Sequence, residues 1–236
     1  MDSAPRFSFL RTLKIGSFNF GSAMVDILTA SVWNRILISD LGASATPVSL
    51  LLALRYLLAP LSIWVGFRSD TTPIGGLRRT PYIWLGRGLM LLALILLPIS
   101  TLRLAADLND PIGWVAAIGL FIAYGAGTAI SGGPFLALIH DRTPAAKRGV
   151  AISIVQMILL FGFALSPIAF GRLLPEYSPD KFQGLVLGTT LIAMIIWLVS
   201  IAGEERRVTA GEVRTAEQQP SLRTMLKSMW ADRRAR

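Results

Sequence analysis

Six apolar stretches of about 20 residues or more dominate the sequence, and each is long enough to cross the roughly 30 Å hydrocarbon core of a membrane as a helix. They cover approximately residues 15–39, 47–67, 82–102, 112–138, 150–173 and 182–202. An open strand in lipid would leave its backbone N–H and C=O groups unpaired, so each stretch is expected to be a helix. The sequence therefore predicts an all-α membrane protein with six transmembrane helices.

Lysine and arginine are distributed unevenly among the connections between these stretches. Seventeen of the 23 basic residues precede the first stretch, join the second to the third or the fourth to the fifth, or follow the sixth, whereas the opposite connections hold three. Basic connections stay on the cytoplasmic side, so both termini are predicted to be cytoplasmic. The tryptophans fit the same topology as an aromatic belt, with Trp33 and Trp114 at outer helix ends and Trp64, Trp84 and Trp197 at inner ends.

The composition changes after the sixth stretch, which divides the chain into three parts. We expect a transmembrane bundle over residues 1–203, a polar cytoplasmic linker over 204–220, and an amphipathic interfacial helix with a basic tail over 221–236. In the last part, apolar residues recur at helical spacing from Leu222 to Trp230, which gives one apolar face. Such a helix lies on the cytoplasmic leaflet and binds anionic lipid, while the alternative is a flexible basic tail. A basic run after a surface helix is also typical of a chain that continues into another span.

The residue content excludes most catalytic chemistry. The chain has no cysteine and a single histidine, His140, which rules out disulfides, iron–sulfur clusters, thiolate zinc sites and a histidine-rich metal site. No phosphate-binding loop and no Ser-His-Asp or paired-carboxylate arrangement is present. We therefore expect neither an enzyme nor a bound metal or nucleotide. The net charge of +9 follows from topology and lipid contact, so nucleic acid is not an expected partner.

Two charged residues fall near the middle of predicted spans. Asp26 lies in the first stretch and Arg55 in the second, both close to mid-depth. Each charge costs about 2.5 to 3.5 kcal/mol at a helix centre, so the two are expected to face the bundle interior or a wet cavity, where they could pair. The pair could be a proton or substrate site, or equally a structural tie between two helices.

Other polar and small residues in the spans have milder interpretations. Asn34 and Arg35 lie at the outer end of the first stretch, where an arginine anchors by reaching the headgroups. Arg87 is expected to reach the cytoplasmic surface or Asp70. The small-residue run over 124–134 favours close helix packing, with a flat surface for a pigment as the alternative.

The loop between the second and third stretches carries a charged cluster. Asp70 follows the second stretch, and Arg78 and Arg79 precede the third. An acid at a helix end can hold arginines and the neighbouring helix terminus in place. These residues therefore predict a latch that breaks and forms as helices rock during alternating access.

This loop, with Gly66, Ser69–Asp70 and Arg78–Arg79, resembles the signature loop of the major facilitator superfamily. The resemblance implies a bundle equivalent to one six-helix half of such a transporter. A lone half has nothing to rock against, so the expected partner is a second six-helix half or a second copy of the chain.

A closer resemblance is to the PucC-type bacteriochlorophyll delivery family of that superfamily. Residues 33–42, including Asn34 and Arg35, carry it, together with 58–60, the loop from Arg68 through Arg78 and Arg79 to 84, and 141–149. The resemblance covers residues 10–236 as the N-terminal half of a family member. It implies a membrane assembly or pigment-delivery factor that handles bacteriochlorophyll for light-harvesting or reaction-centre polypeptides, in the cytoplasmic or intracytoplasmic membrane of a phototrophic bacterium.

Within that interpretation, His140 could supply an axial nitrogen to the pigment's magnesium, or simply belong to the polar network of its loop. Two other functions stay open. The chain could be an ion-coupled small-solute symporter that uses Asp26 as a proton carrier. It could also be a structural subunit without transport activity, bound to a photosynthetic complex.

Overall fold

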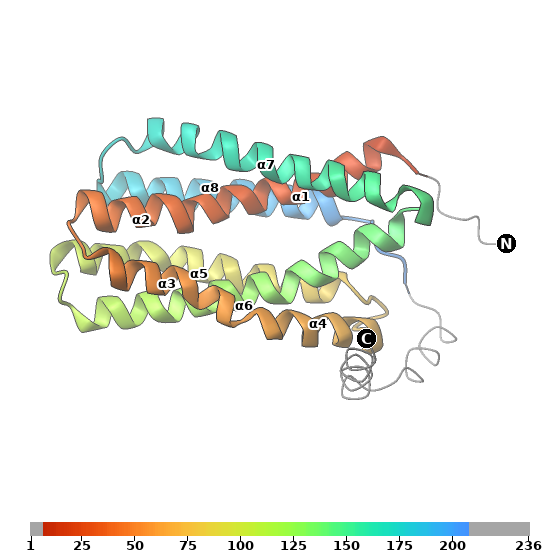
Figure 1. The fold of residues 1–236 in the computed structure, drawn as a ribbon, viewed down its shortest axis with the longest axis horizontal. Helices are drawn as coiled ribbons and strands as arrows, with labels where there is room; N and C mark the ends of the chain where they lie inside the picture. The colour runs from red at the N-terminus through yellow and green to blue at the C-terminus, as the bar shows by residue number, and fades with distance from the viewer. Residues whose placement is uncertain (1–6, 208–236) are drawn as a thin grey trace, which may run out of the picture.

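The computed structural model describes residues 7–207, and within them the chain is helical with no β-strand, apart from a single bridge between Ile74 and Leu77. Helices run side by side along one long axis (Figure 1). The α-helices are α1 (Phe9–Ile27), α2 (Trp33–Arg35), α3 (Ala45–Leu57), α4 (Ala59–Thr71), α5 (Thr80–Ala106), α6 (Pro111–Arg142), α7 (Arg148–Leu173) and α8 (Pro179–Ile201). Two π-helical segments, η1 (Leu28–Val32) and η2 (Ile36–Asp40), and a 3₁₀ turn, η3 (Ala145–Lys147), complete the set.

Five helical segments in the described part are long and apolar enough to cross a membrane, and each matches a predicted stretch. They are Ala45–Thr71, Thr80–Ala106, Pro111–Arg142, Ala145–Leu173 and Pro179–Ile201. The first predicted stretch is also helical, because α1, η1, α2 and η2 follow one another without a break from residue 9 to residue 40. That this run crosses the membrane as a sixth span, and that both termini are cytoplasmic, stay predictions. The segment 221–236, for which an interfacial helix is predicted, and most of the predicted linker lie outside the described residues.

The helices form two layers (Figure 1): α1 packs against α7 and α8 in one layer, and α6 packs against α3, α4 and α5 in the other. The tightest approach is between α5 and α6. There Gly86 and Gly127 face each other so closely that a Cβ on either would overlap the carbonyl oxygen of the other. The small-residue run therefore serves close packing, as small residues do where no hydrophobic force drives helices together in lipid.

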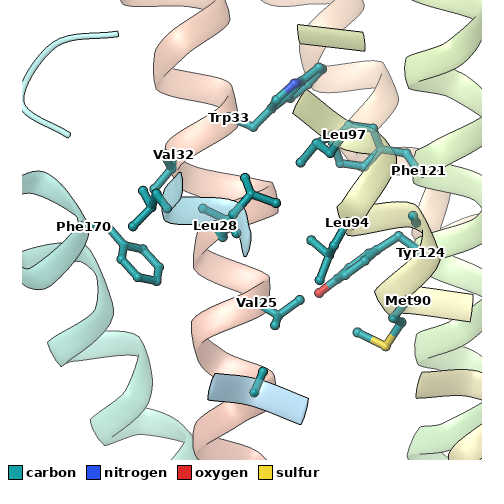
Figure 2. Packing of buried hydrophobic residues seen from close by; sticks show 14 of the residues in the cluster. Val25, Leu28, Val32, Trp33, Met90, Leu94, Leu97, Phe121, Tyr124 and Phe170 are labelled. Atoms are coloured by element: carbon teal, nitrogen blue, oxygen red, sulfur yellow. The ribbon is translucent and has the colours of Figure 1, made fainter. Parts of the chain in front are cut away.

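The two layers meet in an apolar core that Figure 2 shows in close-up. Residues Val25, Leu28, Val32 and Trp33 of the first helical run share this core with Leu94, Leu97, Phe121, Tyr124 and Phe170 from three other helices. The Trp33 ring lies 4.7 Å from the Phe121 ring, and its indole N–H donates to the Thr101 hydroxyl at 3.0 Å. Trp33 and Trp197 are both fully buried, so the prediction that they belong to a lipid-facing aromatic belt is wrong. Burial with a satisfied indole N–H gives each ring an interior role.

The turn between α5 and α6 is fixed by Asp110. Its carboxylate accepts from the Ile112 amide at 3.0 Å, which caps α6, and from Arg103 Nε at 2.9 Å. Partial desolvation raises the pKa of Asp110, but the hydrogen bonds from Arg103 and from the backbone outweigh it and hold that pKa below its ordinary value. The α5–α6 hairpin is thus closed at one end by a charged cap and along its length by glycine contacts.

Candidate functional site

A polar cluster lies near the middle of the bundle, where α1, α3 and α6 meet. Arg55 Nη1 lies 3.3 Å from Asp26 Oδ1, and the Tyr124 hydroxyl donates to the same oxygen at 2.8 Å. Figure 2 shows that hydroxyl directed towards the first helical run, beside Val25. The structure therefore brings together the two charges that the sequence placed at mid-depth, and adds a phenol from a third helix. We call Asp26, Arg55, Tyr56 and Tyr124 the intramembrane cluster.

Tyr56 joins the cluster through Arg55. Arg55 Nη2 donates to the Tyr56 hydroxyl at 3.0 Å, and the guanidinium carbon lies 5.0 Å from the centre of the Tyr56 ring. Helices α3 and α6 can approach each other here because position 125, in α6, is glycine. A Cβ on Gly125 would lie 2.9 Å from the Arg55 Cα in α3. The close approach of α6 thus positions Arg55 beside Asp26.

The intramembrane cluster is only partly covered by protein. The Asp26 and Arg55 side chains keep 26% and 27% of their surface exposed, and Tyr56 is exposed as well. A charge at this depth is stable only beside a partner, water or a polar ligand. The open side of the cluster is therefore where a ligand or a covering protein surface can reach the buried charges.

Arg87 is a second buried cation, and its expected position at the cytoplasmic surface is wrong. Its side chain is only 5% exposed, with the guanidinium carbon 4.3 Å from the Phe18 ring centre and 4.5 Å from that of Trp197. Within residues 7–207 no carboxylate lies within ion-pairing distance of it. Residue 87 points into the bundle, where two aromatic faces replace water around the charge.

At the end of the bundle predicted to be cytoplasmic, Arg79 is the centre of the loop charges. It forms an ion pair with Asp70, lies 3.2 Å from Asp141 Oδ2 through Nε, and donates to the Ser69 hydroxyl at 3.0 Å. Two of the three residues predicted for a latch are thus in contact. Asp141, at the end of α6, is a member that the sequence analysis did not include.

Two glutamates that follow α8 extend this charge network. The Glu205 carboxylate accepts from the backbone amides of Arg78 and Arg79 at 2.6 Å and of Thr80 at 2.5 Å, which caps the N-terminus of α5. The neighbouring Glu204 lies 2.8 Å from Lys14 Nζ in α1. Arg78 therefore enters the network through its backbone, as the first of the three amides. We call Asp70, Arg79, Asp141, Glu204 and Glu205 the loop charge cluster.

Arg35 holds the opposite end of the first helical run. Its Nη2 donates to the Leu174 carbonyl at 2.7 Å and its Nη1 to the Pro175 carbonyl at 3.3 Å, both just beyond the end of α7. Arg35 is therefore engaged with the C-terminus of a neighbouring helix, where a cation is favourable. The adjacent Asn34 has a buried Oδ1 with no hydrogen-bond partner in the described part of the chain.

His140 lies apart from the intramembrane cluster. It is exposed on the last turn of α6, sixteen residues or about 24 Å along that helix from Tyr124. Its imidazole is exposed and forms no hydrogen bond within residues 7–207, and its role as a pigment ligand stays a prediction. Among the same residues, no group of three or more histidine, aspartate or glutamate side chains is arranged to hold a metal ion of its own.

Comparison with known proteins places this architecture in a family. Residues 32–236 match the family model described as "PUCC protein". The chain is 32% identical over 215 residues to "Protein PucC" of Rhodobacter capsulatus, which covers 88% of the chain and 47% of the relative. It is 28% identical over 221 residues to "Protein PucC" of Rhodovulum sulfidophilum, covering 90% of the chain and 49% of the relative.

A further relative has a different name. The "Bacteriochlorophyll synthase 44.5 kDa chain" of Rhodobacter capsulatus is 28% identical over 232 residues, covering 97% of this chain and 51% of that protein. The chain thus spans about half the length of the curated relatives it matches. With a family match over most of its residues, this helical membrane protein belongs to the PucC protein family.

Proposed function

We propose that the chain handles bacteriochlorophyll as an assembly or pigment-delivery factor for bacterial light-harvesting or reaction-centre complexes. Family membership supports this proposal, as does the name of the relative called a bacteriochlorophyll synthase chain. The corresponding location is the cytoplasmic or intracytoplasmic membrane of a phototrophic bacterium. The corresponding partners are light-harvesting or reaction-centre polypeptides and, at the C-terminal basic segment, anionic lipid. The chain itself carries out no chemical conversion.

The observation that carries the proposal is the partly open intramembrane cluster. A bacteriochlorophyll presents keto and ester carbonyl groups on a large apolar ring, so it needs hydrogen-bond donors within an apolar wall. Arg55 and Tyr56 supply such donors beside the open side, and the surrounding helices supply the apolar wall. Removing the ring from lipid requires little energy, and the donors would fix its orientation.

In this proposal the loop charge cluster works as the latch of a major-facilitator-like half. Arg79 holds Asp70 and Asp141 together, and so connects the end of α4 to the end of α6. Rocking of the bundle against a second six-helix half, or against a second copy of the chain, would break and re-form these ion pairs. Both termini lie on the cytoplasmic side in this arrangement.

Asp26 supports one alternative function. A partly exposed carboxylate at mid-depth is what an ion-coupled small-solute symporter needs as a proton carrier. A transport-inactive structural subunit of a photosynthetic complex would instead use the cluster only to tie α1 to α3. The experiment below distinguishes the three functions.

The test is pigment content. The tagged chain is purified in mild detergent from phototrophically grown cells, and bacteriochlorophyll per chain is measured by absorbance for wild type, Arg55→Gln and Arg103→Gln. We expect pigment to co-purify with wild type and to fall at least about fivefold in Arg55→Gln, with no change in Arg103→Gln, whose arginine lies in the last turn of α5 and pairs with Asp110.

The other outcomes favour the alternatives. Pigment that co-purifies equally with wild type and with both variants would favour the structural subunit. Absence of pigment, together with solute uptake that Asp26→Asn abolishes, would favour the symporter. A His140→Leu variant with unchanged pigment spectrum would remove His140 as a magnesium ligand in any of these functions.

A further inference from the structure

The charges inside the bundle do not balance. In the described part of the chain, three charged side chains lie well inside helical runs: Asp26, Arg55 and Arg87. Two are cations and one is an anion, so one positive charge has no internal counterpart. A buried charge without compensation is costly, and more so where lipid replaces water.

The one carboxylate is also used incompletely. Arg55 and Tyr124 both donate to the same oxygen of Asp26, Oδ1, instead of the two-oxygen pairing that an arginine and a carboxylate prefer. Within residues 7–207, Arg55 Nε is buried with no hydrogen-bond partner. The Arg55 guanidinium therefore has capacity for a second anionic group.

Arg87, further along the bundle, also has a buried hydrogen-bond donor that is not used within residues 7–207. Its Nε is buried with no hydrogen-bond partner in the part of the chain that the structure describes, and its Nη1 donates to the Met90 sulfur at 3.3 Å. The Thr128 hydroxyl lies 3.7 Å from the same sulfur and donates to the Tyr124 carbonyl. Arg87 thus lies at the inner end of a row of polar contacts that leads to the intramembrane cluster, and its charge adds to the positive field there.

From this imbalance we infer that the intramembrane cluster binds a ligand with an ionised carboxylate, held by Arg55. The inference rests on the proposed function and narrows it: the ligand is a bacteriochlorophyll-type tetrapyrrole as the free acid, not as its long-chain ester. Esterification removes the negative charge of the propionate group, so the ester cannot compensate Arg55 and Arg87. Membrane phosphate groups stay at the headgroup level, away from this mid-depth cluster.

The cluster is open in the direction such a ligand needs. Arg55 and Tyr56 are adjacent in sequence, and both are accessible from outside the bundle. A carboxylate that takes the place of the Tyr56 hydroxyl on Arg55 Nη2 would replace a neutral hydrogen bond of the guanidinium with a charged one. The ring of the ligand would then lie along the exposed apolar surface of α3.

A binding titration with the purified chain in lipid nanodiscs at pH 8 tests the inference. The probes are bacteriochlorophyllide, which has the free carboxylate, bacteriochlorophyll, its long-chain ester, and palmitate as a competitor with a carboxylate but no ring. We expect wild type to bind the acid at least about tenfold more tightly than the ester, with weak competition by palmitate.

Two substitutions should act in opposite directions. Arg55→Gln removes the binding cation and should lower affinity for the acid about tenfold more than affinity for the ester, because the ester loses only hydrogen bonds while the acid also loses its ion pair. Asp26→Asn removes the resident anion that competes for Arg55 and should raise affinity for the acid severalfold. The control, Arg103→Gln, removes an arginine that is paired with Asp110 and should change neither affinity.

Each other result overturns a defined part of the inference. Equal binding of acid and ester by wild type would refute it while leaving the pigment proposal intact, whereas absence of pigment binding would refute the proposed function itself. Equal weakening by Asp26→Asn and Arg55→Gln would show a purely structural pair. Palmitate that competes as well as the acid would show that the site binds a carboxylate and ignores the ring. If Arg55→Gln fails to fold, the Asp26→Asn variant tests the inference by itself. Higher affinity for the acid supports the inference, and lower affinity refutes it.

Discussion

At the scale of single residues, the two buried arginines are held in different ways. Arg55 has a carboxylate beside it and an open side, while Arg87 is enclosed between the rings of Phe18 and Trp197. Aromatic faces can contribute about 2 kcal/mol to a desolvated cation, which is less than the cost of burying a full charge. The Arg87 charge is therefore not retained for stability alone.

Replacing Arg87 by methionine should show whether burying the charge costs more free energy than the two aromatic rings return. Methionine fills a similar apolar volume without a charge, so Arg87→Met is expected to unfold at the same temperature as wild type or higher. Arg87→Ala leaves a cavity between the two rings and should lower stability by about 2 to 4 kcal/mol. Thermal unfolding of the two variants in detergent measures the difference, and equal losses would mean that the charge itself stabilises the fold.

The sequence was most informative about these residues where a single position was chemically unusual. A charge inside an apolar stretch is visible without a structure, so Asp26 and Arg55 could be identified and their contact anticipated. Tyr124 could not, because it lies 98 residues from Asp26 and tyrosine is common in helices. Its position beside Gly125 in the small-residue run was the one available signal.

At the scale of elements, glycine contacts decide how closely helices approach. Gly127→Ala places a methyl group against the Gly86 carbonyl and the Met90 side chain, so it should force α5 and α6 apart and lower stability by about 1 to 3 kcal/mol. Gly119→Ala is the matched control on the same helix, since nothing lies within 4 Å of a Cβ there. That control should be neutral or stabilising by up to about 1 kcal/mol in thermal unfolding. Similar losses in both variants would contradict the packing role of Gly127.

The cap of α6 offers a test by pH. Because the folded state holds the pKa of Asp110 below its ordinary value, the cap stabilises the fold above the unfolded pKa of the carboxyl and loses this effect as pH falls through the lower folded pKa. Asp110→Asn should therefore melt below wild type at neutral pH and converge with it in acid. A gap in melting temperature that stays constant from pH 7 to pH 3 would contradict this assignment.

The first helical run shows what sequence periodicity cannot supply. It contains two π-helical segments, Leu28–Val32 and Ile36–Asp40, each of which shifts the helix register. Apolar length predicts a helix here but not a change from i−4 to i−5 hydrogen bonding within it. The position of Trp33 near a helix end favours a lipid-facing belt, and only the fold, which packs Trp33 against Phe121, shows that it is buried.

At the scale of the whole molecule, Glu205 connects the ends of two distant helices. Its carboxylate satisfies three backbone amides at the start of α5. Glu205→Ala should therefore lower stability by about 1 to 2 kcal/mol, while Glu205→Asp should keep part of the effect. Thermal unfolding provides the comparison, and Glu176→Ala, in the exposed α7–α8 loop, is the control. If Glu205→Ala behaves like the control, the cap does not stabilise the fold.

The long-range organisation was predictable in outline only. Apolar length predicted six spans, five of which are long and apolar enough in the described residues, and basic residues at one end gave an expected topology. Both effects come from the membrane and act on every such chain. The loop charge cluster was predictable as far as Asp70 and Arg79, which lie in one loop. Asp141 and Glu205 reach that loop only through the fold, so their charges carried no local signal.

The adjacent position of Glu204 and Glu205 limits how this end of the molecule can move. Glu204 forms an ion pair with Lys14 of α1, and Glu205 accepts from backbone amides at the start of α5. Two consecutive residues therefore contact one helix from each layer. The layers cannot slide past each other at this end unless one of these two contacts is broken. Any opening that leaves both intact has to keep α1 and α5 together at this end and tilt the two layers as one rigid block.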